Sequence, residues 1–181
     1  MNKISHKSRA AYTLIELIIA MTILGLLSGV LVSIISVNFN VMTQVSDRKK
    51  LITRGMLATN LFQRELGMLK TTDNILIADD QQLKFSDAYG NTWEYLITGN
   101  QLTRQEVGVG SAQILASPII NAESEFSYYA QDNSGLTSTP LNGANRGLVT
   151  LVKLNLVMDY NGDGIVLMAI VYPENFKVFN H

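Results

Sequence analysis

The sequence predicts an α+β protein in which one long N-terminal helix packs through its second half on an antiparallel β-sheet. Three observations carry this fold class. A charge-free apolar run lies near the start of the chain, a helical stripe without proline continues it to about residue 70, and a period of two replaces the helical period beyond that point. We expect the helix over 12–70 and a β-rich region over 71–181, since 181 residues suit one domain with an appendage.

The apolar run is long enough to cross a membrane. From Leu17 to Val37 there are 21 residues without a charge, and at about 1.5 Å per residue they span the roughly 30 Å hydrocarbon core. The apolar region of a secretory signal peptide is shorter, at about 7 to 15 residues. We therefore expect a transmembrane part at about 14–37. Three basic residues and no acid before it indicate a cytoplasmic N-terminus. Four basic residues follow the run, so their number alone does not favour this orientation, but Arg9 lies closer to the run than any of these four. The first group is Lys3, Lys7 and Arg9, and the second is Arg48, Lys49, Lys50 and Arg54.

The residues after the run predict an amphipathic continuation of the helix over 38–70. Apolar side chains recur there mostly at separations of three, four or seven, which is the pattern of a helix with one buried face. They are Val41, Val45, Ile52, Met56, Leu66 and Leu69. This half of the helix is predicted to cover the sheet.

Beyond residue 70 the sequence alternates short apolar stretches with turn signals. The stretch "NILIADDQQLKFSDAYGNTWEYLITGNQLTRQ" is typical of an antiparallel meander, in which Leu83 and Phe85 share a face, as do Trp93, Tyr95 and Ile97. "EFSYYAQD" is a further strand candidate. "LVTLVKLNLVMD" and "IVLMAIVYP" are two apolar strands that "YNGDG" joins as a hairpin. We expect a sheet of four to six strands.

Composition excludes several classes of function. A net charge of −1 lacks the surplus of Lys and Arg that phosphate binding needs, so no nucleic acid contact is predicted. There is no cysteine for a disulfide or a thiolate metal site, and both histidines lie at the ends of the chain. The sequence contains no nucleophile motif and no phosphate loop. We therefore predict a protein without catalytic residues and without a small-molecule substrate.

Two pairs of carboxylates are the remaining candidates for acid–base chemistry. Asp79 and Asp80 are adjacent, so on a strand they would point to opposite faces. Glu123 and Glu125 would share a face, but no group of tuned basicity accompanies them. Both pairs are expected to be solvated charges.

One carboxylate, Glu16, lies at the start of the apolar run. A charge at helix depth in a membrane is costly, so a partner or a functional role is expected. No basic side chain lies within the run. A cut between Ala11 and Tyr12 would create an α-amine with a pKa of about 8 in the same layer, on this subunit or on its neighbour. The chemistry leaves the alternative open that Glu16 snorkels to the headgroups or is protonated.

The segment "AAYTLIELIIAMTILGLL" resembles the cleavage and methylation segment of type IV pilin-like proteins, the family of type IV pilins and type II secretion pseudopilins. A short basic leader ends in a small residue, and an aromatic residue, Thr-Leu-Ile-Glu and a long apolar helix follow. The resemblance covers about residues 3 to 37. It implies a pilin-like fold, removal of the leader 1–11 by a prepilin peptidase, N-methylation of Tyr12, and pairing of Glu16 with the N-terminal amine of an adjacent subunit.

The resemblance also implies a location and partners. The subunit would cross the bacterial inner membrane once, with its N-terminus in the cytoplasm and its globular domain in the periplasm, and would then join other pilins or pseudopilins in a filament. Without the leader the chain holds 11 basic and 15 acidic residues, a net charge of −4. A type IV pilus (fimbrium), a type II secretion system for protein transport and a DNA-uptake relative stay open as the apparatus.

The sequence departs from the family pattern in four ways. Ala11 replaces the usual glycine before the cut, and Tyr12 replaces the commoner phenylalanine. The helix-breaking proline of many major pilins is missing, and so is their paired-cysteine loop. The last two departures favour a minor pilin or minor pseudopilin. The alternative is a monomeric, membrane-anchored periplasmic binding module whose helix is only a tether.

Two further patterns belong to the same reading. The pattern LxFxDxxGNxxxYxIxxxxLxR, which runs from Leu83 to Arg104, resembles a segment of minor pilin-like proteins and is less specific than the N-terminal motif. Gly25 and Gly29 form a small-xxx-small pair of the kind that lets membrane helices approach closely, although glycine is also common in membrane helices.

One stretch matches part of a metal-binding pattern. Asp159, Asn161 and Asp163, followed by Gly164, match the opening of a calcium loop, but Ile170 stands where the closing glutamate is required. Asn and Gly also suit a tight hairpin turn. We expect the turn, no cofactor, and calcium only as a weak alternative.

Overall fold

The computed structural model describes residues 13–173. The chain divides into two compact units, Met1–Ser46 and Asp47–His181. Helix α1 (Leu14–Gly67) contributes to both. The long N-terminal helix and the antiparallel sheets confirm the predicted α+β fold class.

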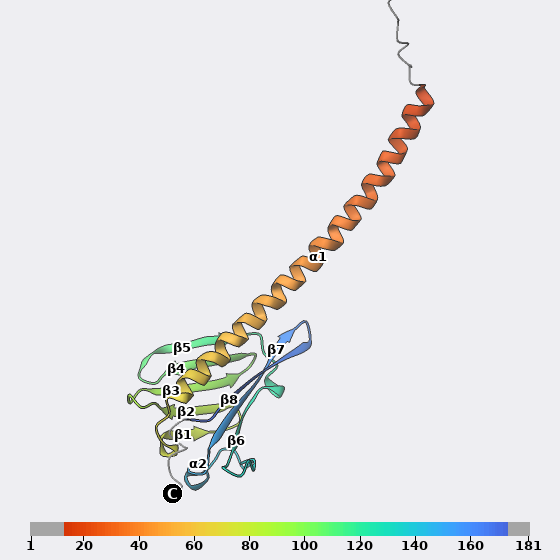
Figure 1. The fold of residues 1–181 in the computed structure, drawn as a ribbon. Coiled ribbons are helices and arrows are strands. Elements are labelled where there is room, and N and C mark those ends of the chain that lie inside the picture. The colour runs from red at the N-terminus through yellow and green to blue at the C-terminus, as the bar shows by residue number, and fades with distance from the viewer. Residues whose placement is uncertain (1–12, 174–181) are drawn as a thin grey trace, which may run out of the picture. The chain divides into compact units, whose positions relative to one another are not determined.

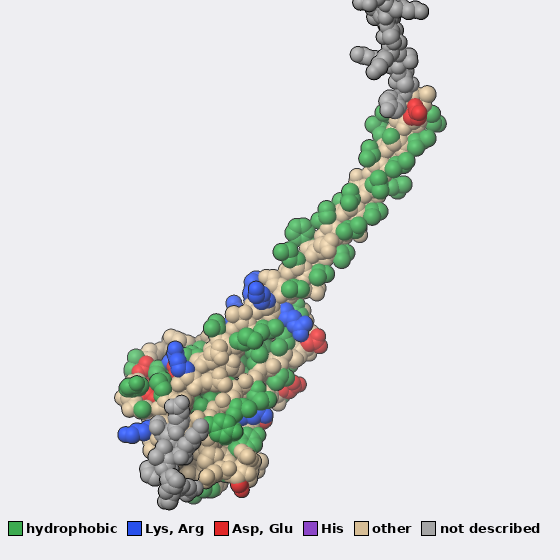
Figure 2. Space-filling model, in the orientation of Figure 1, with side chains coloured by type: hydrophobic (Ala, Val, Ile, Leu, Met, Phe, Trp, Pro, Cys, Tyr) green, Lys and Arg blue, Asp and Glu red, His purple; other side chains and the backbone are tan. Residues whose placement is uncertain are grey.

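The part of α1 in the first unit exposes every described side chain to solvent. Figure 2 shows hydrophobic side chains along this stretch, which is long and apolar enough to cross a membrane. Four of its hydroxyl groups donate hydrogen bonds to backbone carbonyls one turn earlier, so these polar atoms are satisfied within the helix. These residues are Thr22, Ser28, Ser36 and Thr43.

The second unit contains two antiparallel sheets (Figure 1), rather than the single sheet of four to six strands expected from the sequence. The five-stranded sheet is a meander in sequence order: β1 (Ile75–Ala78), β2 (Gln82–Ser86), β3 (Thr92–Thr98), β4 (Gln101–Glu106) and β5 (Val109–Ala116). The three-stranded sheet is β6 (Glu125–Tyr129), β7 (Leu151–Tyr160) and β8 (Asp163–Val171), also in sequence order. Short helical turns lie at η1 (Thr72–Asn74), η2 (Asn121–Glu123) and α2 (Gly143–Arg146).

The predicted faces and the predicted hairpin are confirmed. Leu83 and Phe85 are buried on β2, and Trp93, Tyr95 and Ile97 are buried on β3. The meander sequence, "EFSYYAQD" and the two apolar C-terminal stretches all contain strands, and β7 pairs with β8 along its length. Strand β5 was not among the expected strands, because its sequence lacks a clear alternation of apolar and polar residues.

The buried face of α1 differs from the predicted stripe. Leu66 and Leu69 are buried as expected, but Val41, Val45 and Met56 are more than half exposed, so the stripe was wrong for these three. The observed face begins at the boundary of the second unit and includes small and polar residues: Leu51, Gly55, Ala58, Thr59, Phe62, Glu65 and Leu66. A search for large apolar side chains misses the glycine, the alanine and the glutamate.

Two close contacts explain why this face is built from small residues and one aromatic ring. A Cβ added at Gly55 would lie 2.2 Å from Cδ1 of Leu167 on β8, so the helix approaches the three-stranded sheet closely. The ring of Phe62 contacts Tyr95 of one sheet at 5.3 Å between centroids and Phe126 of the other at 5.8 Å. The helix therefore joins the two sheets into one core.

Candidate functional site

The first candidate site is the start of α1, where Thr13 and Glu16 form a reciprocal cap. The backbone N–H of Thr13 donates to Oε2 of Glu16 at 2.8 Å, and the Thr13 hydroxyl donates to the same atom at 3.1 Å. The backbone N–H of Glu16 in turn donates to Oγ1 of Thr13 at 3.4 Å. This is a capping box, which satisfies backbone donors that a helix start leaves unpaired. The sequence reasoning missed Thr13, although Thr-x-x-Glu before an apolar run is its signature.

The cap does not exhaust the capacity of the Glu16 carboxylate. Both hydrogen bonds from Thr13 reach Oε2, and a carboxylate has about four lone-pair sites over its two oxygens. Glu16 is also exposed. Thr13 fixes its carboxylate, which can still accept hydrogen bonds from a further donor. The residues of the predicted cleavage site, Ala11 and Tyr12, lie outside the described residues, so no geometry joins them to Glu16.

The glycine pair lies on the exposed part of the helix. A Cβ added at Gly25 or Gly29 would meet nothing within 4 Å. Neither glycine is thus required by a contact inside the described chain, in contrast to Gly55. Their use in packing against another helix stays a prediction.

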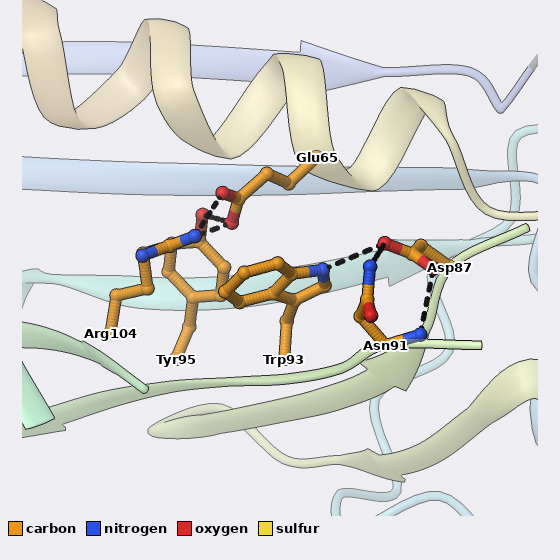
Figure 3. A network of polar contacts seen from close by, with 6 residues as sticks. All are labelled: Glu65, Asp87, Asn91, Trp93, Tyr95 and Arg104. Atoms are coloured by element: carbon orange, nitrogen blue, oxygen red, sulfur yellow. Dashed lines mark hydrogen bonds and ion pairs between the residues drawn. The ribbon is translucent and has the colours of Figure 1, made fainter. Parts of the chain in front are cut away.

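The second candidate site is a buried polar network between α1 and the five-stranded sheet (Figure 3). Glu65 of α1 is only 2% exposed. Arg104 of β4 donates to both of its carboxylate oxygens, with Nε at 2.9 Å from Oε2, and the Tyr95 hydroxyl of β3 donates to Oε2 as well. The ion pair is therefore a bidentate fork, the strong form of an arginine–carboxylate contact.

The network continues from Arg104 to the turn before β3. The Arg104 guanidinium lies over the ring of Trp93, with Cζ at 3.9 Å from the centroid. The indole N–H of Trp93 donates to Oδ2 of Asp87 at 3.0 Å. Asp87 also accepts from the backbone N–H groups of Tyr89 and Asn91 and from the Asn91 side chain. A chain of contacts thus leads from the helix, through the sheet, to the β2–β3 turn.

The charges in this network have identifiable effects on pKa. Burial and the neighbouring Glu65 carboxylate raise the pKa of the Tyr95 phenol. The hydrogen bond to Glu65 raises the pKa of Arg104 further above its usual value. Burial opposes ionisation of Asp87, but the hydrogen bonds from Trp93, Asn91 and Tyr89 together outweigh it and lower the pKa of that carboxyl. Near neutral pH the network therefore holds a neutral phenol, a guanidinium and an ionised Asp87.

The structure explains the pattern that runs from Leu83 to Arg104. Its apolar positions are core residues, which are Leu83, Phe85, Ile97 and Leu102. Its polar positions form the turn or reach Glu65: Asp87, Gly90 and Asn91 shape the β2–β3 connection, where Gly90 has a φ of +91°, and Tyr95 and Arg104 hold the helix. The partner that completes the pattern, Glu65, stands 18 residues before it.

The metal candidate is a hairpin turn. Tyr160 pairs with Asp163, and the two residues between them, Asn161 and Gly162, have φ values of 55° and 90° as a two-residue turn requires. Oδ1 of Asp159 accepts the backbone N–H of Gly162 at 2.9 Å, which explains the aspartate without an ion. Within residues 13–173 no group of three or more His, Cys, Asp or Glu side chains is arranged to hold a metal.

The acidic pairs considered for acid–base chemistry also have structural surroundings. Oδ1 of Asp79 accepts the backbone N–H of Asp80 at 2.8 Å in the turn after β1, and the same neighbour raises the pKa of Asp80. The backbone carbonyl of Glu123 accepts from Asn155. Glu125 accepts a hydrogen bond from the Ser127 hydroxyl at 3.3 Å. Both pairs therefore take part in local turn and strand geometry.

The comparison with known families agrees with the helix start. Residues 6–32 match the family described as the prokaryotic N-terminal methylation motif. No curated protein matches the chain. The class that the fold and the site define is a prepilin-like protein, with a methylation motif ahead of a long hydrophobic helix packed on antiparallel sheets. The chain is a type IV pilin-like protein.

Membership carries general consequences. Pilin-like proteins are typically non-enzymatic structural proteins, and the motif implies processing by a prepilin peptidase and assembly with pilins. The motif and the hydrophobic helix together suggest anchoring in the inner membrane before assembly.

Proposed function

We propose that this protein is a non-enzymatic minor subunit of a type IV pilus or a type II secretion pseudopilus. A prepilin peptidase removes residues 1–11, Tyr12 becomes the N-methylated first residue, and the subunit waits in the inner membrane with its β-rich region in the periplasm. It then joins the filament through α1, with Glu16 paired to the N-terminal amine of an adjacent subunit. Gly25 and Gly29 lie on the packing surface between helices.

The observation that supports the proposal is the length of apolar helix whose side chains are not buried against any other described part of the subunit. Residues 13–50 are all exposed, and the 30 residues from Leu17 to Ser46 contain no charge. At about 1.5 Å per residue these 30 residues measure roughly 45 Å along the helix, whereas the hydrocarbon core of a bilayer is about 30 Å thick. A bilayer therefore leaves apolar side chains such as Phe39 and Met42, at 67% and 72% exposed, only partly covered. Packing against neighbouring helices would cover them in full.

The Glu16 carboxylate supports the same proposal. Thr13 holds it at the first turn and leaves bonding capacity for a cation from outside the described residues. The new α-amine of Tyr12, on the same or an adjacent chain, is a cation of the right kind in the same interfacial layer. In a low-dielectric layer this attraction is stronger than at a protein surface in water.

The first test is the N-terminus of the native protein. Mass spectrometry of the membrane fraction should find a chain that begins at Tyr12 and carries one N-methyl group. A chain that still begins at Met1, or that is cut elsewhere, would contradict the assembly proposal and favour a tethered monomeric binding module.

The second test is Glu16→Ala, measured by the fraction of the protein that incorporates into filaments. We expect a large loss, because the counter-ion of the neighbouring amine is gone. Asp47→Ala is the matched control, since Asp47 is an exposed acid on the same helix that pairs only with exposed Lys50 in the described structure. Incorporation of the Glu16 variant at the level of the control would show that the carboxylate has no role in assembly.

A further inference from the structure

A group of four basic residues follows the charge-free helix segment. We call Arg48, Lys49, Lys50 and Arg54 the basic collar; all four side chains are exposed. The acid within this stretch, Asp47, lies 3.2 Å from the Lys50 ammonium, and both side chains are more than half exposed, so this pair is weak. Figure 2 shows Lys and Arg side chains gathered where the hydrophobic surface of the helix ends. The collar keeps a net charge of about +3 over residues 47–54.

The rest of the second unit has the opposite charge. Residues 66–173 hold 5 basic and 11 acidic residues, a net charge of −6. The positive charge of this unit is therefore concentrated on the helix, and the β-rich region is acidic. An anionic surface would attract the first and repel the second.

The length of the charge-free segment places the collar relative to a bilayer. The segment from Leu17 to Ser46 measures roughly 45 Å along the helix at about 1.5 Å per residue. A bilayer with both headgroup layers is about 40 to 45 Å thick. When Glu16 lies at one membrane surface, the collar begins at the other surface. Its side chains then lie within one Debye length, about 8 Å at physiological ionic strength, of the headgroups there.

The collar also surrounds the helix rather than lining one side of it. At about 100° per residue, its four positions cover roughly 240° of the circumference. They avoid the centre of the buried face, which Leu51, Gly55 and Ala58 mark. A ring of cations suits a plane that the helix passes through, whereas a protein partner on one flank would contact only part of it.

We propose that the basic collar binds the anionic phosphate headgroups of the leaflet that faces the β-rich region. The inference rests on the proposed insertion of α1 in the membrane. The contact anchors the outer end of the apolar helix at the headgroup layer and holds the acidic β-rich region away from it. The ligand class is an acidic phospholipid. The site also explains why basic residues follow the span on the side where lysine and arginine are usually scarce.

The test uses the full chain reconstituted in two kinds of vesicle, phosphatidylcholine alone and phosphatidylcholine with one third phosphatidylglycerol. A membrane-impermeant amine reagent modifies exposed lysines, and mass spectrometry gives the rate at each site. At about 1 kcal/mol per basic residue near an anionic surface, Lys49 and Lys50 should react about fivefold more slowly in the acidic vesicles. Lys70, an exposed lysine outside the collar, is the internal control and should not change. About 1 M salt should remove the difference.

A variant sharpens the experiment. Arg48→Gln with Arg54→Gln keeps the two reporter lysines and should reduce their protection, while Lys84→Gln should leave it unchanged. Equal rates at Lys49 in the two vesicles would overturn the proposal. Protection that appears in phosphatidylcholine alone and grows with protein density would also overturn it, in favour of the acidic surface of a second copy. A chain that does not float with either vesicle would contradict the proposed membrane insertion, which is a distinguishable failure.

Discussion

Two glutamates on one helix have opposite surroundings. Glu16 is exposed at the start of α1 and accepts hydrogen bonds only from Thr13 among the described residues, whereas Glu65 is buried near the end of α1 and accepts from Tyr95 and Arg104. Glu65 therefore has its cation inside the subunit. Glu16 has no cationic partner among residues 13–173, and this difference separates a residue that maintains the fold from one available for assembly.

The same contrast holds for the two halves of the helix. Gly55 is required by a contact with Leu167 inside the second unit, but Gly25 and Gly29 meet nothing. Every described side chain of α1 before Leu51 is exposed, whereas from Leu51 onward one face of the helix is buried. Contacts inside the subunit thus explain the residues of the second half of α1 but not those of the first half. Substitutions in the second half should therefore affect stability, and substitutions in the first half should affect assembly.

The largest loss of unfolding free energy is expected from Glu65→Ala. It leaves the Arg104 guanidinium and the Tyr95 hydroxyl of the core without their acceptor, and breaking a buried ion pair in this way costs about 3 to 5 kcal/mol of unfolding free energy. Urea unfolding of the full chain in detergent measures the change. Asp73→Ala, an exposed acid on η1, is the control and should stay within about 0.5 kcal/mol. A Glu65 variant as stable as this control would mean that the network does not hold the helix to the sheet.

A smaller loss of unfolding free energy is expected from Gly55→Val. The added side chain would overlap Leu167 and approach Met158, and overpacking of this kind costs about 1 to 3 kcal/mol. Gly29→Val introduces the same residue in the same helix, at a position with no neighbour within 4 Å. Comparing the unfolding free energies of the two variants therefore corrects for the helix propensity of valine. We expect Gly29→Val to unfold like the unmodified protein and to assemble poorly. Equal unfolding free energies for both variants would contradict the close helix–sheet approach.

The stabilisation by Asp87 is expected to be present at neutral pH and to be lost in acid. Its pKa is lowered in the folded protein, so the unfolded chain binds more protons as the pH falls, and the stabilisation is present above the unfolded pKa of about 4. It is lost progressively as the pH falls through the folded pKa. Asp87→Asn should therefore be less stable than the unmodified protein at pH 7, and the gap should narrow below about pH 4. Urea unfolding at several pH values tests this, and a gap that is independent of pH would contradict it.

Much of this fold follows from pattern in the sequence, and the exceptions have a common physical reason. The apolar span, the alternating strands β2 and β3 and the Asn-Gly hairpin are local signals that need no tertiary partner. The buried face of α1 could not be predicted in the same way. Gly55 and Ala58 are small residues on the side where the helix packs closely on the sheets, and Glu65 is buried because it pairs with Arg104, 39 residues away. Thr13 was within reach, since its capping box is a local signal.

The smallest effect on stability is expected from Thr13→Ala, and it separates two roles of the helix start. Removing the N-cap hydroxyl weakens the first turn by about 1 kcal/mol, which should appear as faster amide hydrogen exchange in that turn and leave the unfolding of the second unit unchanged. Thr13→Ala keeps the Glu16 charge, while Glu16→Gln removes the charge but retains an acceptor for the Thr13 N–H. If charge drives assembly, Glu16→Gln should reduce incorporation into filaments much more than Thr13→Ala. A larger defect for Thr13→Ala would mean that the shape of the helix start, rather than its charge, is what the neighbouring subunit recognises.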